Sequence, residues 1–235
     1  MDVLRQALCN VAFLHWRLDP AVAAPHLPPG TRPDVREDST YVGVVALRIA
    51  RTAPGRGLRI PYLGSFDQVN VRLYSVDDAG RHAVAFLRMD AGRLVPAVAT
   101  RAALRLPYVW SRTRVRRDGD RYEVTVGDRR IRLRIGAPVE PGPLELFLTD
   151  RRGLHARAAG RTLHLPLAHA PWPLHRAELT ALDGDPLAAA GLTGVTGPPV
   201  SVLWSPGVDD ARFGPPSGVA RPARGPWSPG RGPRG

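Results

Sequence analysis

The sequence contains no lysine, so all 33 basic residues among its 235 are arginine. Schiff-base chemistry through a side chain is therefore excluded, because arginine stays protonated and cannot replace a deprotonated amine. The only cysteine, Cys9, cannot form an internal disulfide, and this fits a reducing compartment. We interpret Cys9 as a small buried hydrophobic side chain.

Long apolar runs and cofactor motifs are also missing. No run approaches the roughly 20 residues of a membrane helix, and the N-terminus lacks the charged lead and apolar core of a signal peptide. We therefore expect a cytoplasmic protein without membrane contact. His164, His169 and His175 are separated by five and six residues, match no metal motif and have prolines between them. Ser111 and Ser201 lack a nucleophile motif, and we expect no cofactor and no metal.

The net charge of +12 comes from arginine alone. Use of arginine in place of lysine, together with abundant Ala, Pro and Gly, fits a GC-rich coding bias. The alternative is an anion-binding surface for nucleic acid or an acidic protein. Residues 112–116 and 130–134 alternate arginine with uncharged residues, which predicts a sheet with one Arg-rich face. We interpret this face as solvated, with Glu123 between like charges, and do not expect a nucleic-acid partner.

Short strands linked by turn signals dominate the chain. They predict an α+β protein, mainly an antiparallel β-barrel or curved sheet around a central cavity, with a few short helices. We expect one domain over residues 1–211 and a disordered tail over 212–235, which is rich in Gly, Pro and Arg. The expected strands are residues 11–18, 41–50, 68–76, 82–89, 108–117, 121–126, 130–135, 161–167, 174–181 and 200–204.

Four helices are expected. Asp19-Pro20 supplies an N-cap and a proline at the first helical position. The longest candidate is residues 91–104, and two shorter ones are residues 144–149 and 185–191. Residues 53–65 are expected to form a loop, because they contain several Pro, Gly and Ser residues.

The segment FDQVNVRLY, residues 66–74, carries the main site prediction. Alternate residues of a strand share a face, so Gln68, Asn70, Arg72 and Tyr74 project to the same side. If this face lines a cavity, it is suited to a small polar or anionic ligand. A buried arginine must be compensated, either by a bound anion or by an internal acid such as Glu37, Asp38 or Asp67. A structural polar cluster is the alternative.

Two further residues are candidates for the same site. His15, on the first expected strand, can act as an acid or base in the useful pH range, although a lone histidine is more often structural. Arg112 shares an expected strand face with Tyr108 and Trp110, which predicts either a ligand wall or a cation–π packing cluster.

Several segments together resemble the YqjF-like bacterial family of unknown function, which belongs to the acetoacetate decarboxylase-like superfamily. The most specific are NVRLY (70–74) and LPYVWSR (106–112), supported by residues 13–20, 26–34, 85–105, 144–151, 168–179 and 201–209. The resemblance implies a curved antiparallel sheet around a central cavity and no assigned activity. The namesake decarboxylase uses a cavity lysine that this chain lacks. Gln68 stands where the family pattern has glutamate, so one potential acid–base group is also missing.

These observations favour a cytoplasmic protein that binds a small molecule in a barrel cavity. One alternative is an enzyme that acts on a small carbonyl or carboxylate compound without a Schiff base, with Arg72 holding the anionic group and His15 or Tyr74 transferring a proton. The other is a binder of nucleic acid or acidic protein through the Arg-rich face. The sequence contains no signal for an oligomeric state.

Overall fold

The computed structural model describes residues 2–58, 64–93, 106–158 and 160–219. This part of the chain consists mainly of strands that join in one large mixed sheet. The strands are β1 (Leu4–Leu18), β2 (Thr31–Pro33), β3 (Thr40–Pro54), β4 (Phe66–Asp77), β5 (His82–Ala91), β6 (Tyr108–Trp110), β7 (Thr113–Asp118), β8 (Arg121–Val126), β9 (Arg129–Pro138), β10 (Gly153–Ala158), β11 (Arg161–Ala168), β12 (His175–Asp183), β13 (Ser201–Phe213) and β14 (Ser217–Gly218). The helices are α1 (Pro20–Ala23), the 3₁₀ turn η1 (Ala24–His26), α3 (Pro143–Thr149) and α4 (Pro186–Ala189).

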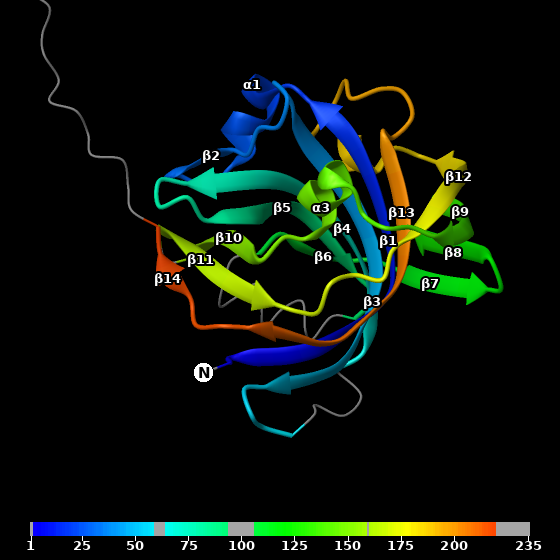
Figure 1. The fold of residues 1–235 in the computed structure, drawn as a ribbon, viewed down its shortest axis with the longest axis horizontal. Coiled ribbons are helices and arrows are strands. Elements are labelled where there is room, and N and C mark those ends of the chain that lie inside the picture. Colours follow the sequence, from blue (N-terminus) through cyan, green and yellow to red (C-terminus); the bar gives the residue numbers. More distant parts are fainter. Residues whose placement is uncertain (1, 59–63, 94–105, 159, 220–235) are drawn as a thin grey trace, which may run out of the picture.

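Seven of the strands pair in a closed ring, in the order β11, β10, β5, β4, β3, β1 and β13 (Figure 1). The ring closes where Leu167 of β11 pairs with Phe213 of β13. Within the ring β10 runs parallel to β5, and the other neighbours are antiparallel. Strands β12, β9, β8 and β7 continue from β13 as an antiparallel wing beside the ring.

The ring separates two hydrophobic cores. The inner core collects side chains from every ring strand, for example Phe13 of β1, Tyr74 of β4 and Leu154 of β10. Only the inside of the ring is common to all of these strands, so this core lines the interior. The outer core packs the opposite faces of β1, β3 and β4, including Val44 and Val71, against the wing and the short helices.

A bulge in β1 keeps its inward side chains on one side. Asn10 has a φ of 49°, a left-handed conformation that asparagine tolerates better than most residues. The register of β1 against β3 shifts between Cys9 and Ala12. As a result, Leu8 before the bulge and Phe13 after it both belong to the inner core.

The α+β fold, mostly strand with short helices, is confirmed. Nine of the ten predicted strands are present as single strands, whereas the predicted strand 108–117 is divided into β6 and β7. Several predicted strands were shorter than the observed ones: β1 begins at Leu4, and β3 runs to Pro54, into the predicted loop. The strands β2, β10 and β14 were missed. The sequence DRRG, residues 150–153, reads locally as a turn although its glycine begins β10, and β10 is fixed by its pairing with β11 and with the distant β5.

The predicted helices at 144–149 and 185–191 are confirmed as α3 and α4. Asp19 caps α1 by accepting a hydrogen bond from the amide of Ala21 at 2.7 Å. Residues 94–104 of the longest expected helix lie outside the described residues, whereas Ala91 ends β5. The expected tail also began too early, because Arg212 and Phe213 lie in β13 and are followed by β14.

Candidate functional site

Three inward positions on adjacent strands form what we call the polar row: His15, Gly43 and Arg72. His15 of β1 pairs with Gly43 of β3, and Gly43 pairs with Arg72 of β4. Neighbouring strands lie about 4.8 Å apart, so an imidazole and a guanidinium flank a glycine across roughly 10 Å of sheet. Tyr74, the next inward residue of β4, packs its ring against that of His15, with centroids 6.1 Å apart.

The β4 face predicted from period two is formed. Tyr74 belongs to the inner core, and the alternate residues Val69, Val71 and Leu73 belong to the outer core. All four predicted polar residues, Gln68, Asn70, Arg72 and Tyr74, are buried. Their role in binding a ligand is not decided by this placement.

Arg72 exposes only 9% of its surface, and no carboxylate of the described residues forms an ion pair with it. Its Nη2 donates to the carbonyl of Leu148 at 3.1 Å, whereas its Nε has no partner. The guanidinium also lies 5.8 Å from the centroid of the Phe13 ring and 5.7 Å from that of Tyr74. Among the described residues, partial charges alone balance the charge of Arg72.

The acids that the sequence offered as partners of Arg72 are engaged elsewhere or exposed. Asp67 pairs with Arg48 at 3.1 Å, and Glu37 pairs with Arg36 at 3.0 Å. Asp38 is exposed. The predicted internal-acid alternative is thus wrong for these three residues.

His15 is completely buried, and neither ring nitrogen has a hydrogen-bond partner. Burial, with the positive charges of Arg72 and Arg151, holds the pKa of His15 well below its usual value. The imidazole is therefore neutral, with one N–H donor and one nitrogen acceptor both unused. A buried polar group without partners is rare and requires an explanation.

Gly43 lets the side chains of His15 and Tyr74 pack close to the backbone of β3. A Cβ at this position would lie 3.0 Å from Cδ2 and 3.3 Å from Nε2 of His15, and 3.3 Å from the hydroxyl of Tyr74. The other inward residues of β3 are large, including Tyr41, Val45 and Leu47. Glycine in a strand interior often marks a close approach of another group. This close packing was missed by sequence reasoning, since it depends on the pairing of β1 with β3.

A second buried arginine, Arg151, was also missed. It forms an ion pair with the buried Asp34, and its Nε donates to the carbonyl of Phe147 at 2.6 Å. Its guanidinium lies 4.7 Å from the Tyr74 ring centroid, and its Nη2 has no partner. Asp34 also contacts Nδ1 of the exposed His82 at 2.8 Å. The interior next to the polar row is therefore positively charged.

The two amides of β4 differ in their contacts. Oε1 of Gln68 accepts a hydrogen bond from the hydroxyl of Tyr108 at 3.2 Å, and burial raises the pKa of Tyr108. Oδ1 of Asn70 is buried and has no partner. Asn70 therefore adds another unused polar atom to the inner face.

Arg112 does not join these residues. It is exposed in the link between β6 and β7, whereas Tyr108 is buried and Trp110 is 61% exposed. Tyr108 and Trp110 lie on β6, but Arg112 lies beyond its end. The three residues thus do not form one continuous ligand wall.

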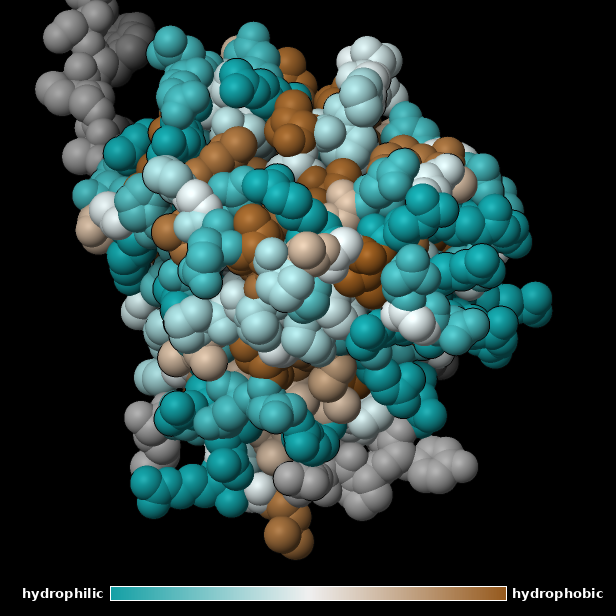
Figure 2. Space-filling model, turned by 45° about the vertical axis from the view of Figure 1, so that its right-hand side comes forward, coloured by the Kyte–Doolittle hydropathy of each residue, from teal (hydrophilic) through white to brown (hydrophobic). Residues whose placement is uncertain are grey.

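The remaining sequence candidates are the three histidines and the Arg-rich face of the wing. Among the described residues no group of three metal-binding side chains occurs. On the wing, Glu123 accepts from Nε of Arg132 at 2.8 Å and lies 3.9 Å from Nε of Arg130, and these arginines lower its pKa. The side of the molecule that carries the wing is largely hydrophilic (Figure 2). This mixed-charge surface fits the solvated interpretation.

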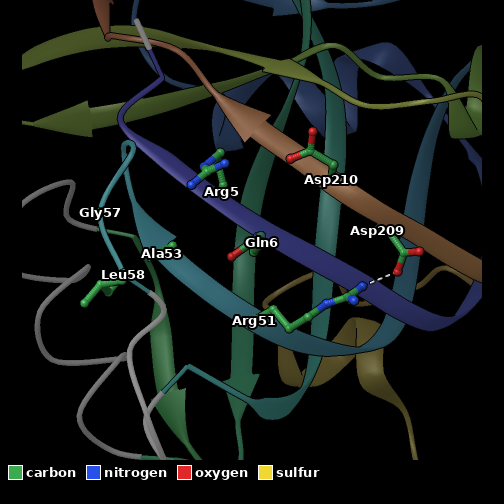
Figure 3. A pocket seen from close by; sticks show the side chains of 8 residues that line it. All are labelled: Arg5, Gln6, Arg51, Ala53, Gly57, Leu58, Asp209 and Asp210. Atoms are coloured by element: carbon green, nitrogen blue, oxygen red, sulfur yellow. Dashed lines mark hydrogen bonds and ion pairs between the residues drawn. The ribbon is translucent and has the colours of Figure 1, made fainter.

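An open pocket of about 710 Å³ lies away from the polar row, near the start of β1 and the ends of β3 and β13 (Figure 3). It is lined by residues of β1, β3 and β13, among them Arg5, Gln6 and Asp210. Its main charges are already paired, because Arg51 reaches across β1 to Asp209. Unlike the polar row, it offers no buried group without a partner.

Comparison with known families agrees with this architecture. A family model described as "Uncharacterized conserved protein", DUF2071, matches residues 5–209, and the chain belongs to this family. The resemblance seen in the sequence is thereby confirmed. No curated protein matches the sequence.

Solved structures with a similar fold are acetoacetate decarboxylase-like proteins. The enduracididine biosynthesis enzyme MppR, complexed with the condensation product of pyruvate and imidazole 4-carboxaldehyde, has a TM-score of 0.66 and 14% identity, with 94% of this chain and 91% of MppR covered. An acetoacetate decarboxylase-like enzyme from Sphingomonas wittichii has a TM-score of 0.64 and 12% identity, with 94% of each chain covered. Acetoacetate decarboxylase from Legionella pneumophila has a TM-score of 0.64 and 13% identity, with 94% and 90% covered. At these identities the likeness shows the fold alone.

Proposed function

We propose that this protein binds a small polar or anionic molecule inside the ring of strands, with the polar row as its binding site. The observation that carries the proposal is the buried guanidinium of Arg72, which has no carboxylate partner in the described residues and keeps an unpartnered Nε. Isolated buried charge is costly unless a counter-charge is present. A ligand carboxylate or phosphate supplies that charge in a bidentate geometry that suits arginine.

The neighbouring groups support a ligand rather than an empty structural cluster. His15 offers a donor and an acceptor, and Arg151 adds a second guanidinium with an unpartnered nitrogen. Gly43 allows His15 and Tyr74 to lie close together against the sheet. MppR, which shares the fold, has also been solved in complex with pyruvate, a small organic anion. These features favour an organic acid whose head group lies between Arg72 and His15.

Binding is tested by native mass spectrometry of freshly purified protein, followed by calorimetric titration with acetate and pyruvate. The decisive variant is Gly43→Ala, whose added methyl group would press against His15 and Tyr74 and shift them, while removing no hydrogen-bonding group. We expect the wild type to carry or take up an anion and Gly43→Ala to lose it. The matched control is Gly218→Ala, because nothing lies within 4 Å of a Cβ at Gly218.

Equal anion binding by Gly43→Ala and the wild type would contradict the proposed site. Absence of both a co-purified small molecule and anion binding in the wild type would contradict the proposed function itself. Arg72→Met provides a second check, since it retains an unbranched side chain and removes the charge.

A non-Schiff-base enzyme is the second candidate, and the unpartnered imidazole of His15 is the observation that favours it. Tyr74 is the weaker proton donor, because its hydroxyl already donates to the carbonyl of Leu148 at 2.8 Å. With its pKa well below the usual value, His15 is a poor base in the ligand-free protein. A bound anion would raise that pKa, so a proton-transfer role would depend on the ligand. Exchange of α-protons of bound pyruvate with deuterated water, lost in His15→Phe, would support this candidate.

We also propose a cytoplasmic location, which the single cysteine supports. No helix in the described parts of the chain is long and apolar enough to span a membrane.

A further inference from the structure

The inner face of β1, β3 and β4 changes from polar to apolar along the strands. The change occurs at positions that pair with one another across the three strands. One position beyond the polar row, Phe13, Val45 and Asn70 are aligned across the three strands, and we call them the middle row. Farther along lies the apolar row, which consists of Leu8, Ile49 and Phe66. Because inward residues of one strand repeat every two positions, successive rows lie about 7 Å apart.

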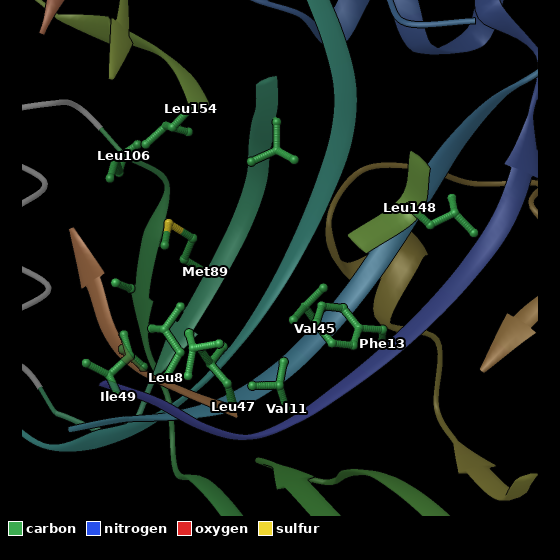
Figure 4. Close-up of a cluster of buried hydrophobic side chains, with 14 of the residues drawn as sticks. Leu8, Val11, Phe13, Val45, Leu47, Ile49, Met89, Leu106, Leu148 and Leu154 are labelled. Carbon is green, nitrogen blue, oxygen red and sulfur yellow. The ribbon is translucent and has the colours of Figure 1, made fainter. Parts of the chain in front are cut away.

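The close-up of the inner core shows the same order (Figure 4). Leu8, Ile49 and Leu47 gather at one end of the strands, Phe13 and Val45 lie side by side farther along, and Leu148 marks the other end. Leu148 is the residue whose carbonyl accepts from Arg72, so this end adjoins the polar row. A molecule with its head at Arg72 would therefore extend toward mostly apolar surroundings, in which Asn70 and Gln68 are the polar inward residues of β4, and Gln68 already accepts a hydrogen bond from Tyr108.

The middle row contains one exception to this gradient. Asn70 exposes 4% of its surface, and its Oδ1 has no hydrogen-bond partner, while Phe13 and Val45 beside it are apolar. An unused carbonyl oxygen at this depth costs free energy unless a donor reaches it. The unused atoms of the inner face thus fall at two levels, one in the polar row and one in the middle row.

We infer that the ligand is an elongated organic acid that carries a hydrogen-bond donor, a hydroxyl or an amide N–H, beyond its carboxylate. The inference rests on the proposed function and specifies its ligand class. The carboxylate lies at Arg72 and His15, the donor reaches Oδ1 of Asn70, and the intervening carbon chain contacts Phe13 and Val45. Met89, which pairs with Asn70 from β5, is a flexible side chain that can adapt to different chains.

Calorimetric titration of the full chain with acetate, butyrate, hexanoate, 4-hydroxybutyrate and 6-hydroxyhexanoate tests this class. We expect affinity to rise with chain length by about fourfold for each buried methylene group. A hydroxyl normally weakens binding in an apolar site, so a hydroxy acid that binds at least as tightly as its parent acid indicates a partner for the hydroxyl. In Asn70→Leu we expect that order to reverse, with the hydroxy acid weakened by about fivefold.

Two further variants keep the result interpretable. Gln6→Leu changes an amide in the open surface pocket and should leave the order unchanged. If Asn70→Leu fails to fold, Val45→Phe narrows the middle row instead, and it should abolish binding of the six-carbon acids while retaining acetate.

The outcomes separate this inference from the proposed function. If acetate binds but neither chain length nor the hydroxyl improves affinity, the ligand class is wrong and the polar row remains the site. If Asn70→Leu preserves the preference for the hydroxy acid, the role of Asn70 is overturned. If no acid binds to the wild type, the proposed function fails and this inference fails with it.

Discussion

The inner and outer faces of β1, β3 and β4 come from the same strands and differ in how they treat polar groups. On the outer face, Val42, Val44 and Leu73 pack into an apolar core that the wing and the short helices cover. On the inner face, His15 and Arg72 are buried just as deeply but keep nitrogen atoms without partners.

Two buried histidines, one on each face, illustrate the contrast between the outer and inner faces. His155 of β10 contacts the outward side chains of β4: its Nδ1 lies 2.9 Å from Oγ of Ser75, and its Nε2 lies 3.5 Å from Oδ2 of Asp77. His15, on the inner face, has no such contacts. His155 thus has one hydrogen-bonded nitrogen, whereas His15 has none. The outer core also contains an unpartnered nitrogen, Nε1 of Trp204, so the faces differ mainly in charge: on the inner face the unpartnered group includes the guanidinium of Arg72. Unpaired buried groups reduce stability, and a charged group costs more than a neutral one.

The largest expected effect on stability is that of replacing Arg151, and it distinguishes this arginine from Arg72. Arg151→Met should destabilise the protein by about 3–5 kcal/mol, because it leaves the buried carboxylate of Asp34 without its arginine partner. Urea unfolding monitored by tryptophan fluorescence measures the change. Arg132→Met is the control, since Arg132 pairs with Glu123 on the surface, where ion pairs contribute roughly 0–1 kcal/mol. Equal effects of the two variants would contradict the assignment of Arg151 as structurally compensated.

Removal of side-chain volume from the outer core should lower the stability of the protein. Leu73→Ala removes a completely buried side chain from the outer core and should cost about 2–5 kcal/mol. Leu58→Ala, at a side chain that is 92% exposed, should change stability by less than about 0.5 kcal/mol. The same denaturant series measures both. A small effect for Leu73→Ala would mean that the outer core is loosely packed and that the contrast between the faces is weaker than described.

Much of the fold was predictable from sequence, because local patterns determine local structure. The alternation in residues 66–74 correctly assigned Gln68, Asn70, Arg72 and Tyr74 to one face, and Asp19-Pro20 correctly marked a helix start. The strand β10 was missed because its pairing, not its composition, defines it.

The site was predictable only in part, because its remaining members depend on long-range register. Arg151 and its partner Asp34 are 117 residues apart in the chain. Gly43 matters only because the pairing of β3 places it between His15 and Arg72. Arg112, by contrast, was assigned from strand alternation that does not hold there, since β6 ends at Trp110 and β7 begins at Thr113.

The pH dependence of stability sharpens the comparison of the two histidines. Burial, aided by the nearby His164, lowers the pKa of His155 to about 4. The unfolded chain binds a proton near pH 6.5 and the folded protein does not, so stability is highest above that pH and falls as the pH drops toward 4. Between pH 7 and pH 5, His155 should account for a loss of about 1–2 kcal/mol.

His155→Gln tests this by retaining a hydrogen bond to Ser75 without the titrating ring. The difference in unfolding free energy between pH 7 and pH 5, measured in urea, should shrink by that amount. An unchanged difference would show that His155 is not the buried group that titrates in this range. His15, His164 and His169, whose pKa values are also lowered, are present in both proteins and cancel in the comparison.

The smallest expected effect on stability is that of Arg72→Met, and it is the most informative for the site. The variant loses one hydrogen bond to the carbonyl of Leu148, which Tyr74 continues to contact at 2.8 Å. It leaves no buried carboxylate unpaired and relieves an uncompensated charge, so ligand-free protein should change by less than about 1 kcal/mol in either direction. Urea unfolding after exhaustive dialysis against a buffer without organic anions provides the measurement, with Arg151→Met beside it. A loss of 3 kcal/mol or more would show that Arg72 is compensated within the protein, as Arg151 is, and would remove the argument that a ligand supplies its counter-charge.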